Sequence, residues 1–536
     1  MCEQSREVRS ENFMRDIKIY DTTLRDGSQG EGISFSAMDK IKIAKKLDEF
    51  GVHYIEGGWP GSNPKDMEFF KQAGKLEFKN SKLVGFGSTR RPKISPSEDE
   101  NLKALIKSGV KIAAIFGKTW DMHVTDVLKI SLHENLKMIK DTIEFLKSKN
   151  FYVFYDAEHF FDGYMKNREY ALETLFSAVS ARCDAVVLCD TNGGMLTHEL
   201  GTIVRAISSE CSNITLGIHT HNDSGLAVAN TLTAVESGAQ IVQGTINGYG
   251  ERCGNADLCA IIPNLQLKMG CKCLPESKLK ELTEVSRYVN EISNMRPQDN
   301  QPFTGRSAFA HKGGVHINAV MKNPASYEHT MPEKVGNHRR ILVSELSGKT
   351  SIILKAKEME LDLTKDNPKT KRILKLIQTM ENHGYHFEAA DGSFELLMKK
   401  AFKKYKPYFT LEGFKVSIEK REDNILISEA IIKVNVNNKE EHTAAEGDGP
   451  VNALDNALRK ALVKFYPTLS KMHLSDFKVR VLDEKAGTAA KVRVLIQSED
   501  ENSSWGTVGV SENIIEASWQ ALADSVEYKL LKDKAK

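Results

Sequence analysis

A short β-branched segment followed by an amphipathic helical segment recurs eight times between residues 17 and 250. Alternating strands and helices imply parallel strands joined by crossovers. Eight such repeats over about 250 residues are typical of a closed α/β barrel, the (β/α)8 TIM barrel. An open doubly wound sheet is the main alternative. The predicted strands are 17–23, 52–59, 82–88, 110–117, 152–159, 185–191, 215–221 and 241–248.

The remainder of the 536-residue chain is long enough for further domains. Its first part is charged and helical in pattern, and loops interrupt it. Further on the pattern returns to strands, and three strands followed by a helix occur twice, which predicts a duplicated βββα unit. We therefore expect a catalytic TIM barrel over 14–275, a mostly helical connecting region over 276–405 and a small α+β domain over 406–536.

The composition excludes several classes of protein. The chain has 74 Lys and Arg against 72 Asp and Glu, a net charge of +2 that argues against nucleic-acid binding. No apolar stretch approaches the ~20 residues that cross a bilayer. The N-terminal 14 residues lack the apolar core of a secretory signal, and the eight cysteines show no disulfide framework. We expect a cytoplasmic protein with neither nucleic acid nor membrane as a partner.

The strongest local signal is the sequence LGIHTHNDSG at 216–225. Residues i and i+2 of a strand face the same side, so His219 and His221 can bind one metal ion. A carboxylate would complete a facial 2-His-1-carboxylate set with open positions for substrate. Asp26, at the end of the first predicted strand, is the best candidate. An isolated HxH pair is more often structural, but its position at a barrel mouth favours a metal site.

Arg25 adjoins Asp26 in the sequence YDTTLRDGSQG at 20–30. A guanidinium stays protonated and presents a planar set of donors, so Arg25 is suited to stabilising a developing oxyanion. The alternative is an Arg–Asp ion pair that only caps a loop.

Two further predicted strand ends carry polar residues. Glu158 could act as a general acid or orient a histidine, and the alternative is a solvated surface residue. The run 190–194 includes Thr191 and could bind a small carboxylate, or it could be an ordinary turn.

The glycines of 248–255 are spaced one residue too widely for a dinucleotide-binding loop, which disfavours nicotinamide chemistry.

Outside the predicted barrel, His311 and His316 lie in a glycine-rich segment, and Tyr327 follows it. Two histidines among glycines suggest a mobile element that reaches an active site. The alternative is that all three are ordinary loop residues.

Two long motifs resemble those of the α-isopropylmalate/homocitrate synthase family. The first is Leu24-Arg25-Asp26-Gly27-x-Gln29 followed by Lys40, and the second is HTHNDSG followed by Leu226 and Ala227. The resemblance covers nearly the whole chain. The segments 54–66 and 384–397 are most similar to the branch that makes citramalate, and the 2-isopropylmalate branch of leucine synthesis is the nearest alternative.

The resemblance implies a metal-dependent condensation of acetyl-CoA with a 2-keto acid, followed by thioester hydrolysis. For the citramalate branch the keto acid is pyruvate and the product is (R)-citramalate for isoleucine synthesis. The implied metal is Mg²⁺ or Mn²⁺, with Zn²⁺ as a third candidate. The implied metal contacts are Asp26, His219, His221 and Asn255. The implied catalytic residues are Arg25, Glu158, His316 and Tyr327. Substrate binding is implied for Arg25, Gln29 and Thr191.

The resemblance also implies a homodimer in which the segment carrying His316 and Tyr327 covers the partner's barrel mouth. The C-terminal domain would be an allosteric module that binds isoleucine through loops 446–454 and 486–494, the alternative being dimerisation without an effector. The family commonly has SxED around the fifth-strand Glu, whereas this chain has Asp156-Ala157-Glu158-His159. The keto-acid pocket therefore differs from the common pattern.

Two other functions remain as alternatives. A hydroxy-acid lyase would keep the barrel and the metal, but the connecting region and the effector domain argue against it. A non-catalytic amino-acid sensor would have no need of the complete set Arg25, Asp26, His219 and His221.

Overall fold

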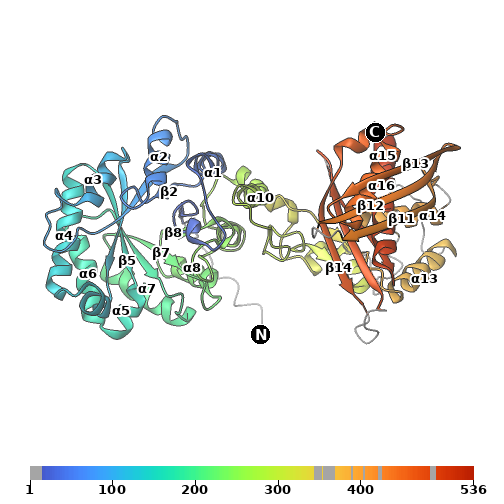
Figure 1. Cartoon of the computed structure of the whole chain (residues 1–536). Helices are drawn as coiled ribbons and strands as arrows, with labels where there is room; N and C mark the ends of the chain where they lie inside the picture. The colour runs from blue at the N-terminus through green and yellow to red at the C-terminus, as the bar shows by residue number, and fades with distance from the viewer. Residues whose placement is uncertain are drawn as a thin grey trace, which may run out of the picture. The chain divides into compact units, whose positions relative to one another are not determined.

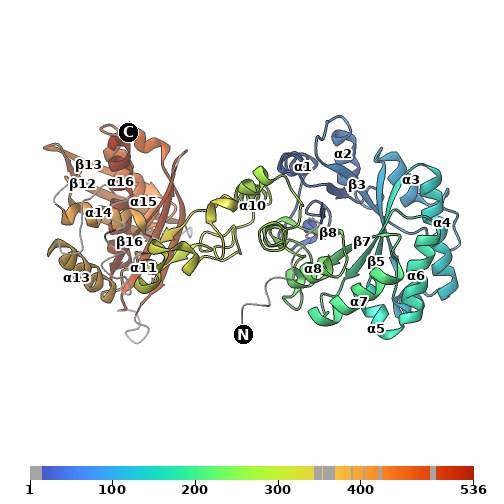
Figure 2. The ribbon, with the colours of Figure 1, turned by 180° about the vertical axis from the view of Figure 1, so that it is seen from behind.

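The computed structural model describes residues 15–342, 353, 368–387, 390–402, 405–420, 425–482, 490–501 and 503–535. The chain divides into two compact units (Figures 1 and 2). The first comprises Met1–Phe309 with His329–Arg339, and the second comprises Ala310–Glu328 with Arg340–Lys536. Residues 486–489 of the predicted effector loop and residues 388–389 lie outside the described part of the chain.

The first unit contains eight parallel strands that close into a barrel in sequence order (Figure 1). Strands β1 and β8 close it, and there Asp21 pairs with Gly244. This confirms the predicted (β/α)8 barrel, and the open doubly wound alternative is wrong. The strands are β1 (Lys18–Asp21), β2 (Tyr54–Gly58), β3 (Lys82–Ser88), β4 (Ile112–Lys118), β5 (Tyr152–Glu158), β6 (Ala185–Asp190), β7 (Thr215–Thr220) and β8 (Ile241–Gly244).

Helices surround the barrel on its outside (Figure 1). The first of them begins with a capping box, in which Ser36 and Asp39 each bond the other's backbone N–H, and it ends at Gly51 with a φ of 96°. The helices are α1 (Ala37–Phe50), α2 (Pro64–Ala73), α3 (Glu100–Lys107), α4 (Leu132–Ser148), α5 (Phe160–Lys166), α6 (Arg168–Ser180), α7 (Thr197–Glu210), α8 (Ala227–Glu236), α9 (Leu258–Pro263) and α10 (Leu282–Ile292).

Both faces of the barrel sheet are buried, because helices cover the outside and side chains fill the inside. The interior core includes Phe154 and Ile241. Since side chains alternate along a strand, the residues two positions later, Asp156 and Gln243, also face inward. The strand ends thus place polar groups directly above an apolar barrel core.

The second unit contains the predicted duplication. The first strand of each copy has a register irregularity at the same place, between Leu411 and Gly413 and between Leu474 and Asp476. This matched irregularity supports two copies of one βββα unit. The first copy is β11 (Thr410–Lys420), β12 (Leu426–Val436), β13 (Lys439–Gly447) and α15 (Pro450–Leu462). The second copy is β14 (His473–Val481), β15 (Val492–Glu499), β16 (Ser504–Ser511) and α16 (Ile514–Ala535).

The segments that precede these copies are largely helical. Phe394 and Met398 of α14 pack with Val508 of β16, so α14 shares a core with the second copy. His316 lies on a short helix within the glycine-rich segment. The elements are β9 (Ala310–His311), α11 (Gly314–Lys322), β10 (Arg340–Ile341), α13 (Pro368–Asn382) and α14 (Asp391–Ala401).

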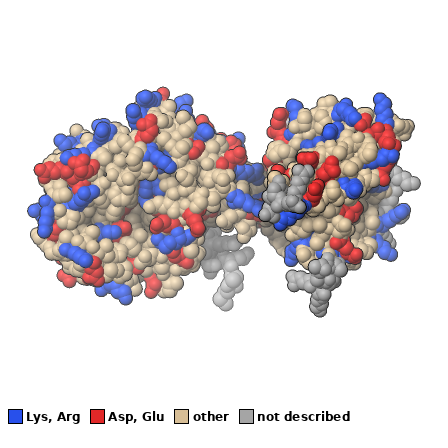
Figure 3. Space-filling model, in the orientation of Figure 1, with Lys and Arg blue, Asp and Glu red and all other residues tan. Residues whose placement is uncertain are grey.

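Basic and acidic side chains are interspersed on the face shown in Figure 3, in keeping with the small net charge. The seven cysteines within the described residues are free thiols. Among the helices that the structure describes, none combines the length and apolar composition of a membrane span.

Candidate active site

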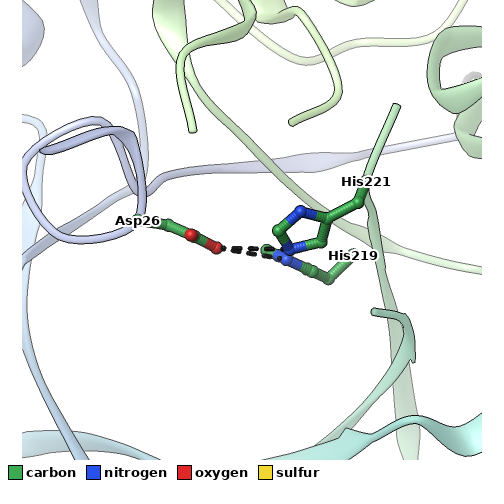
Figure 4. A group of neighbouring side chains, drawn as sticks. All are labelled: Asp26, His219 and His221. Carbon is green, nitrogen blue, oxygen red and sulfur yellow. Dashed lines mark ion pairs between the residues drawn. The ribbon is translucent and has the colours of Figure 1, made fainter. Parts of the chain in front are cut away.

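Asp26, His219 and His221 converge at the mouth of the barrel (Figure 4). Closure of the barrel brings the loop after β1 beside β7. Nε2 of His219 lies 3.3 Å and Nε2 of His221 lies 3.7 Å from the same carboxylate oxygen, Oδ2 of Asp26. One ligand atom from each residue lies within 4.8 Å of the others. This is the donor set of a facial 2-His-1-carboxylate centre.

The electrostatic surroundings keep Asp26 and His221 in the forms that bind a cation. Burial raises the pKa of Asp26, but the Arg25 guanidinium and the hydrogen bond to His219 outweigh it and hold that pKa well below its usual range. Burial, followed by repulsion from His219, lowers the pKa of His221 to about 3. An ionised carboxylate and a neutral imidazole are therefore present at neutral pH, as metal ligation requires.

Arg25 is held by a buried network below the mouth of the barrel. Its Nε donates to Glu56 Oε1, and its Nη1 lies 3.4 Å from Asp26 Oδ2. The fully buried Glu56 also accepts from Tyr20 Oη at 2.5 Å. The Arg25 guanidinium carbon lies 3.8 Å from the centre of the Phe86 ring. These contacts fix a permanent positive charge next to the candidate metal ligands.

A cavity of about 210 Å³ opens above these groups. It brings together seven of the predicted site residues, which come from four different segments of the barrel. Aromatic rings form one wall. The predicted residues that line it are Arg25, Asp26, Gln29, Glu158, Thr191, His219 and His221.

Glu158 and Thr191 have partners that orient them within this cavity. Glu158 forms an ion pair with Lys118, at the end of the neighbouring strand β4. Thr191 Oγ1 accepts a hydrogen bond of 2.9 Å from the backbone N–H of His159. Because that bond uses a lone pair, the hydroxyl hydrogen of Thr191 remains available to donate to an anionic group.

Asn255 lies next to the triad of Asp26, His219 and His221, because its backbone forms an isolated antiparallel bridge with that of His221. The glycine-rich loop 248–255 makes room for it: a Cβ on Gly250, where φ is 156°, would lie 2.1 Å from the Asn255 amide nitrogen. Asn255 Nδ2 donates to Tyr249 O at 3.1 Å, whereas its Oδ1 is buried and has no partner among the described residues. A buried carbonyl oxygen without a donor is suited to a cation or a bound water.

His316 and Tyr327 lie in the second unit, where their rings stack with centroids 4.2 Å apart. Both side chains are exposed. His311 bonds to Glu328 Oε1 through Nε2 at 3.0 Å and is partly buried. His316 and Tyr327 are thus paired with each other, and His311 is paired with Glu328.

Several residues at this site had no role in the sequence analysis. The interior glutamine Gln243 contacts His219, and Lys118 contacts Glu158. Three aromatic side chains, Trp59, Phe86 and Phe116, line the cavity. The only sequence signal for Gln243 is a polar residue within an apolar strand, and the aromatic residues are indistinguishable in sequence from core residues.

Comparison with known proteins identifies the family. An "HMGL-like" domain model matches residues 16–289, a "homocitrate synthase post-HMGL domain-like" model matches 303–384, and a "LeuA allosteric (dimerisation) domain" model matches 388–530. The chain is 57% identical to an (R)-citramalate synthase of Geobacter sulfurreducens over 97% of this chain and 98% of that protein. The chain belongs to the (R)-citramalate synthase family.

Other relatives place it within the wider group. A second (R)-citramalate synthase, from Aquifex aeolicus, is 56% identical over 97% of this chain and 98% of that protein. A 2-isopropylmalate synthase of Methanocaldococcus jannaschii is 31% identical over 96% of this chain and 95% of its own length. The predicted citramalate branch is confirmed, and the leucine-pathway enzymes are more distant.

Proposed function

We propose that this chain is an (R)-citramalate synthase, an acyltransferase that condenses acetyl-CoA with pyruvate and then hydrolyses the thioester. The observation that carries the proposal is the single cavity in which Asp26, His219 and His221 adjoin Arg25 and Thr191. Activation of a 2-keto acid requires a metal centre, a group that stabilises the oxyanion and a hydrogen-bond donor for the substrate carboxylate. Family membership at 57% identity supports the same reaction.

The donor set fits a divalent cation, with Mg²⁺ or Mn²⁺ preferred and Zn²⁺ a third candidate. Asp26, His219 and His221 would hold it, and the buried Asn255 Oδ1 is available to bind it directly or through water. When bound, the cation supplies Lewis-acid activation of the keto carbonyl.

The remaining residues supply binding and proton transfer. Thr191 donates its hydroxyl hydrogen to the pyruvate carboxylate, and Gln29 also lines the cavity. Arg25 stabilises the negative charge that develops on oxygen as the methyl carbon of acetyl-CoA attacks. Glu158 accepts the proton that the acetyl methyl group loses, and Lys118 holds the Glu158 carboxylate in place. His316 and Tyr327 contribute to acid–base chemistry and to the hydrolytic step.

The test is release of free CoA from acetyl-CoA with pyruvate, 2-ketobutyrate, 2-ketoisovalerate or 2-ketoglutarate, each with and without Mg²⁺ or Mn²⁺. We expect metal-dependent release that is fastest with pyruvate. Fastest release with 2-ketoisovalerate would assign the chain to leucine synthesis instead. No release with any of the four would contradict a synthase.

The aromatic wall supports a small keto acid. Phe86 and Phe116 stack at 5.3 Å between ring centroids, and Trp59 meets each of them edge-on at 5.6 Å. These three rings are packed against one another, and close-packed groups resist displacement. A keto acid with a larger side chain therefore cannot easily displace them. We propose that this wall restricts the site to the methyl group of pyruvate.

Phe116→Ala is expected to shift selectivity toward longer keto acids. Each methylene is worth about 1–3 kcal/mol of discrimination, so the ratio of kcat/KM for 2-ketobutyrate to that for pyruvate should rise by about 10-fold or more. Steady-state kinetics on both substrates measures the ratio. Phe176→Ala, which truncates an exposed ring on α6, is the matched control. An unchanged ratio in Phe116→Ala would contradict the proposed wall.

We propose a homodimer with shared active sites, in which segment 310–328 of one subunit covers the barrel mouth of its partner. The match to a dimerisation domain supports a dimer. Exposed apolar side chains on α11 support a protein contact for this segment, since Val315 is 78% and Met321 46% exposed. His316 and Tyr327 are exposed with them and would enter the partner's site.

Mixed dimers test this arrangement. Arg25→Ala and His316→Ala are each expected to be inactive, but a dimer of one with the other retains one intact site of two. Dimers that carry both variants should therefore show about one half of wild-type CoA release. Activity is measured on co-expressed subunits purified through two different tags. No recovery in the mixed dimers would place each site within one subunit.

We propose that the second unit binds isoleucine as a feedback inhibitor. A pocket of about 620 Å³ lies along α15, and Val451 and Asn452 of the predicted loop 446–454 line it. Asp455 also lines it, and its buried Oδ1 has no partner among the described residues. An α-ammonium group would pair with that oxygen, and apolar neighbours such as Leu474 suit a branched side chain.

Asp455→Asn is expected to raise the isoleucine concentration for half-inhibition by about 10–100-fold, because a hydrogen bond to a charged group is worth about 1.5–3 kcal/mol. The measurement is the ratio of CoA-release rates with and without isoleucine. The control compound is 3-methylpentanoate, which keeps the side chain and lacks the ammonium group, and it should inhibit the wild type poorly. Equal inhibition of wild type and variant would contradict a role for Asp455.

A further inference from the structure

Gln243 is a fully buried amide in the interior of the barrel. The preceding residues of β8, Ile241 and Val242, are apolar. Burying an amide in such surroundings costs free energy unless both ends of the amide form hydrogen bonds. An apolar side chain would fill this position at a lower cost in free energy. The contacts of the Gln243 amide indicate why a polar side chain is present instead.

Both ends of the Gln243 amide are bonded. Gln243 is the β-sheet partner of His219 on the adjacent strand β7, so the two side chains emerge side by side into the barrel. Its Oε1 lies 3.0 Å from His219 Nδ1. Its Nε2 lies 3.3 Å from Asp156 Oδ1 on β5, which is also buried. The amide thus bridges a candidate metal ligand and a carboxylate.

Metal binding by His219 requires one tautomer of its ring, and this bridge is suited to that tautomer. The other ring nitrogen, Nε2, faces Asp26 and must present a lone pair to bind a cation. The proton then lies on Nδ1, which needs an acceptor, and the carbonyl oxygen is the acceptor of a glutamine. The Gln243 amide must therefore turn its NH₂ group away from His219, toward the Asp156 carboxylate.

We propose that Gln243, oriented by Asp156, is a positioning residue that fixes the tautomer and ring orientation of His219 for metal binding. The inference rests on the metal centre of the proposed function. It concerns one histidine of the pair, because His221 Nδ1 is buried without a hydrogen-bond partner in the described structure. It also gives a role to Asp156, which stands where the family pattern has Ser.

Mn²⁺ binding tests the proposal without reference to activity. The dissociation constant is measured on the full-length protein by electron paramagnetic resonance of free Mn²⁺. Gln243→Met keeps the length of the side chain and removes the acceptor, and loss of such a partner typically weakens metal binding 10–100-fold. Gln243→Glu keeps an acceptor for His219 and should restore most of the affinity. Asp156→Leu should weaken Mn²⁺ binding. Asp156→Asn keeps an acceptor for the Gln243 amide and should leave Mn²⁺ binding unchanged.

Two controls separate positioning from folding. Gln266→Met removes a comparable amide that donates to a backbone carbonyl, Leu274 O, and should leave Mn²⁺ affinity unchanged. The melting temperature of each metal-free variant shows whether its fold is intact. Wild-type Mn²⁺ affinity in Gln243→Met, or equal losses in Gln243→Met and Gln243→Glu, would overturn the inference. Absence of Mn²⁺ binding by the wild type would instead overturn the metal centre itself.

Discussion

Asp26→Asn is expected to lower metal-dependent CoA release by at least about a thousandfold. Asp26 is the one carboxylate of the triad, and the substitution removes its charge while preserving its shape. Lewis-acid activation is worth several kcal/mol, and each ~1.4 kcal/mol corresponds to a factor of ten in rate. Mn²⁺ binding should be lost together with turnover.

The matched control is Asp16→Asn. Asp16 precedes strand β1, whereas Asp26 follows it, and Asp16 pairs only with the exposed Lys18 among the ion pairs described. Its variant should keep both Mn²⁺ affinity and CoA release. Substantial turnover of Asp26→Asn at saturating Mn²⁺ would contradict the assignment of Asp26 as a ligand.

Arg25→Ala is expected to lower kcat by about 10²–10³-fold, the usual cost of removing one oxyanion donor. In contrast to Asp26→Asn, this variant should still bind Mn²⁺, because Arg25 contributes no ligand. The distinction matters because Arg25 lies 3.4 Å from Asp26, and a loss of rate alone would not separate their roles.

Arg25→Lys separates the effect of the positive charge from the effect of the planar donor geometry. Lysine keeps the positive charge but lacks the planar donor set that Glu56 and Phe86 hold in place, so we expect incomplete recovery of kcat. The melting temperature must be recorded, since Arg25→Ala leaves the buried Glu56 without its cation. A change confined to KM, with kcat unaffected, would contradict transition-state stabilisation by Arg25.

The barrel and the convergence of Asp26, His219 and His221 were predictable from sequence for a clear physical reason. Strand periodicity places His219 and His221 on one face, and closure of an eight-strand barrel brings Asp26 from the far end of the domain beside them. Both arguments depend only on the pattern of the chain and on the geometry of the fold.

The supporting residues were not predictable in the same way. Gln243 and Lys118 acquire their roles from neighbours on other strands, at distances that no sequence spacing encodes. Trp59, Phe86 and Phe116 have the composition of core residues, and only the structure shows that they face a cavity. The glycine-rich sequence around His316 suggested a mobile element, with an ordinary loop as the alternative, whereas residues 314–322 form a helix.

The most direct test of the central claim is whether this chain forms a carbon–carbon bond between its two substrates. Acetyl-CoA labelled with ¹³C at the methyl carbon and pyruvate labelled with ¹³C at the carbonyl carbon are incubated with the enzyme and Mn²⁺, and the metal is removed before the ¹³C spectrum is recorded. We predict a product whose two labelled carbons are joined and split each other by one-bond coupling. CoA release without any coupled product would mean simple thioester hydrolysis and would contradict the account.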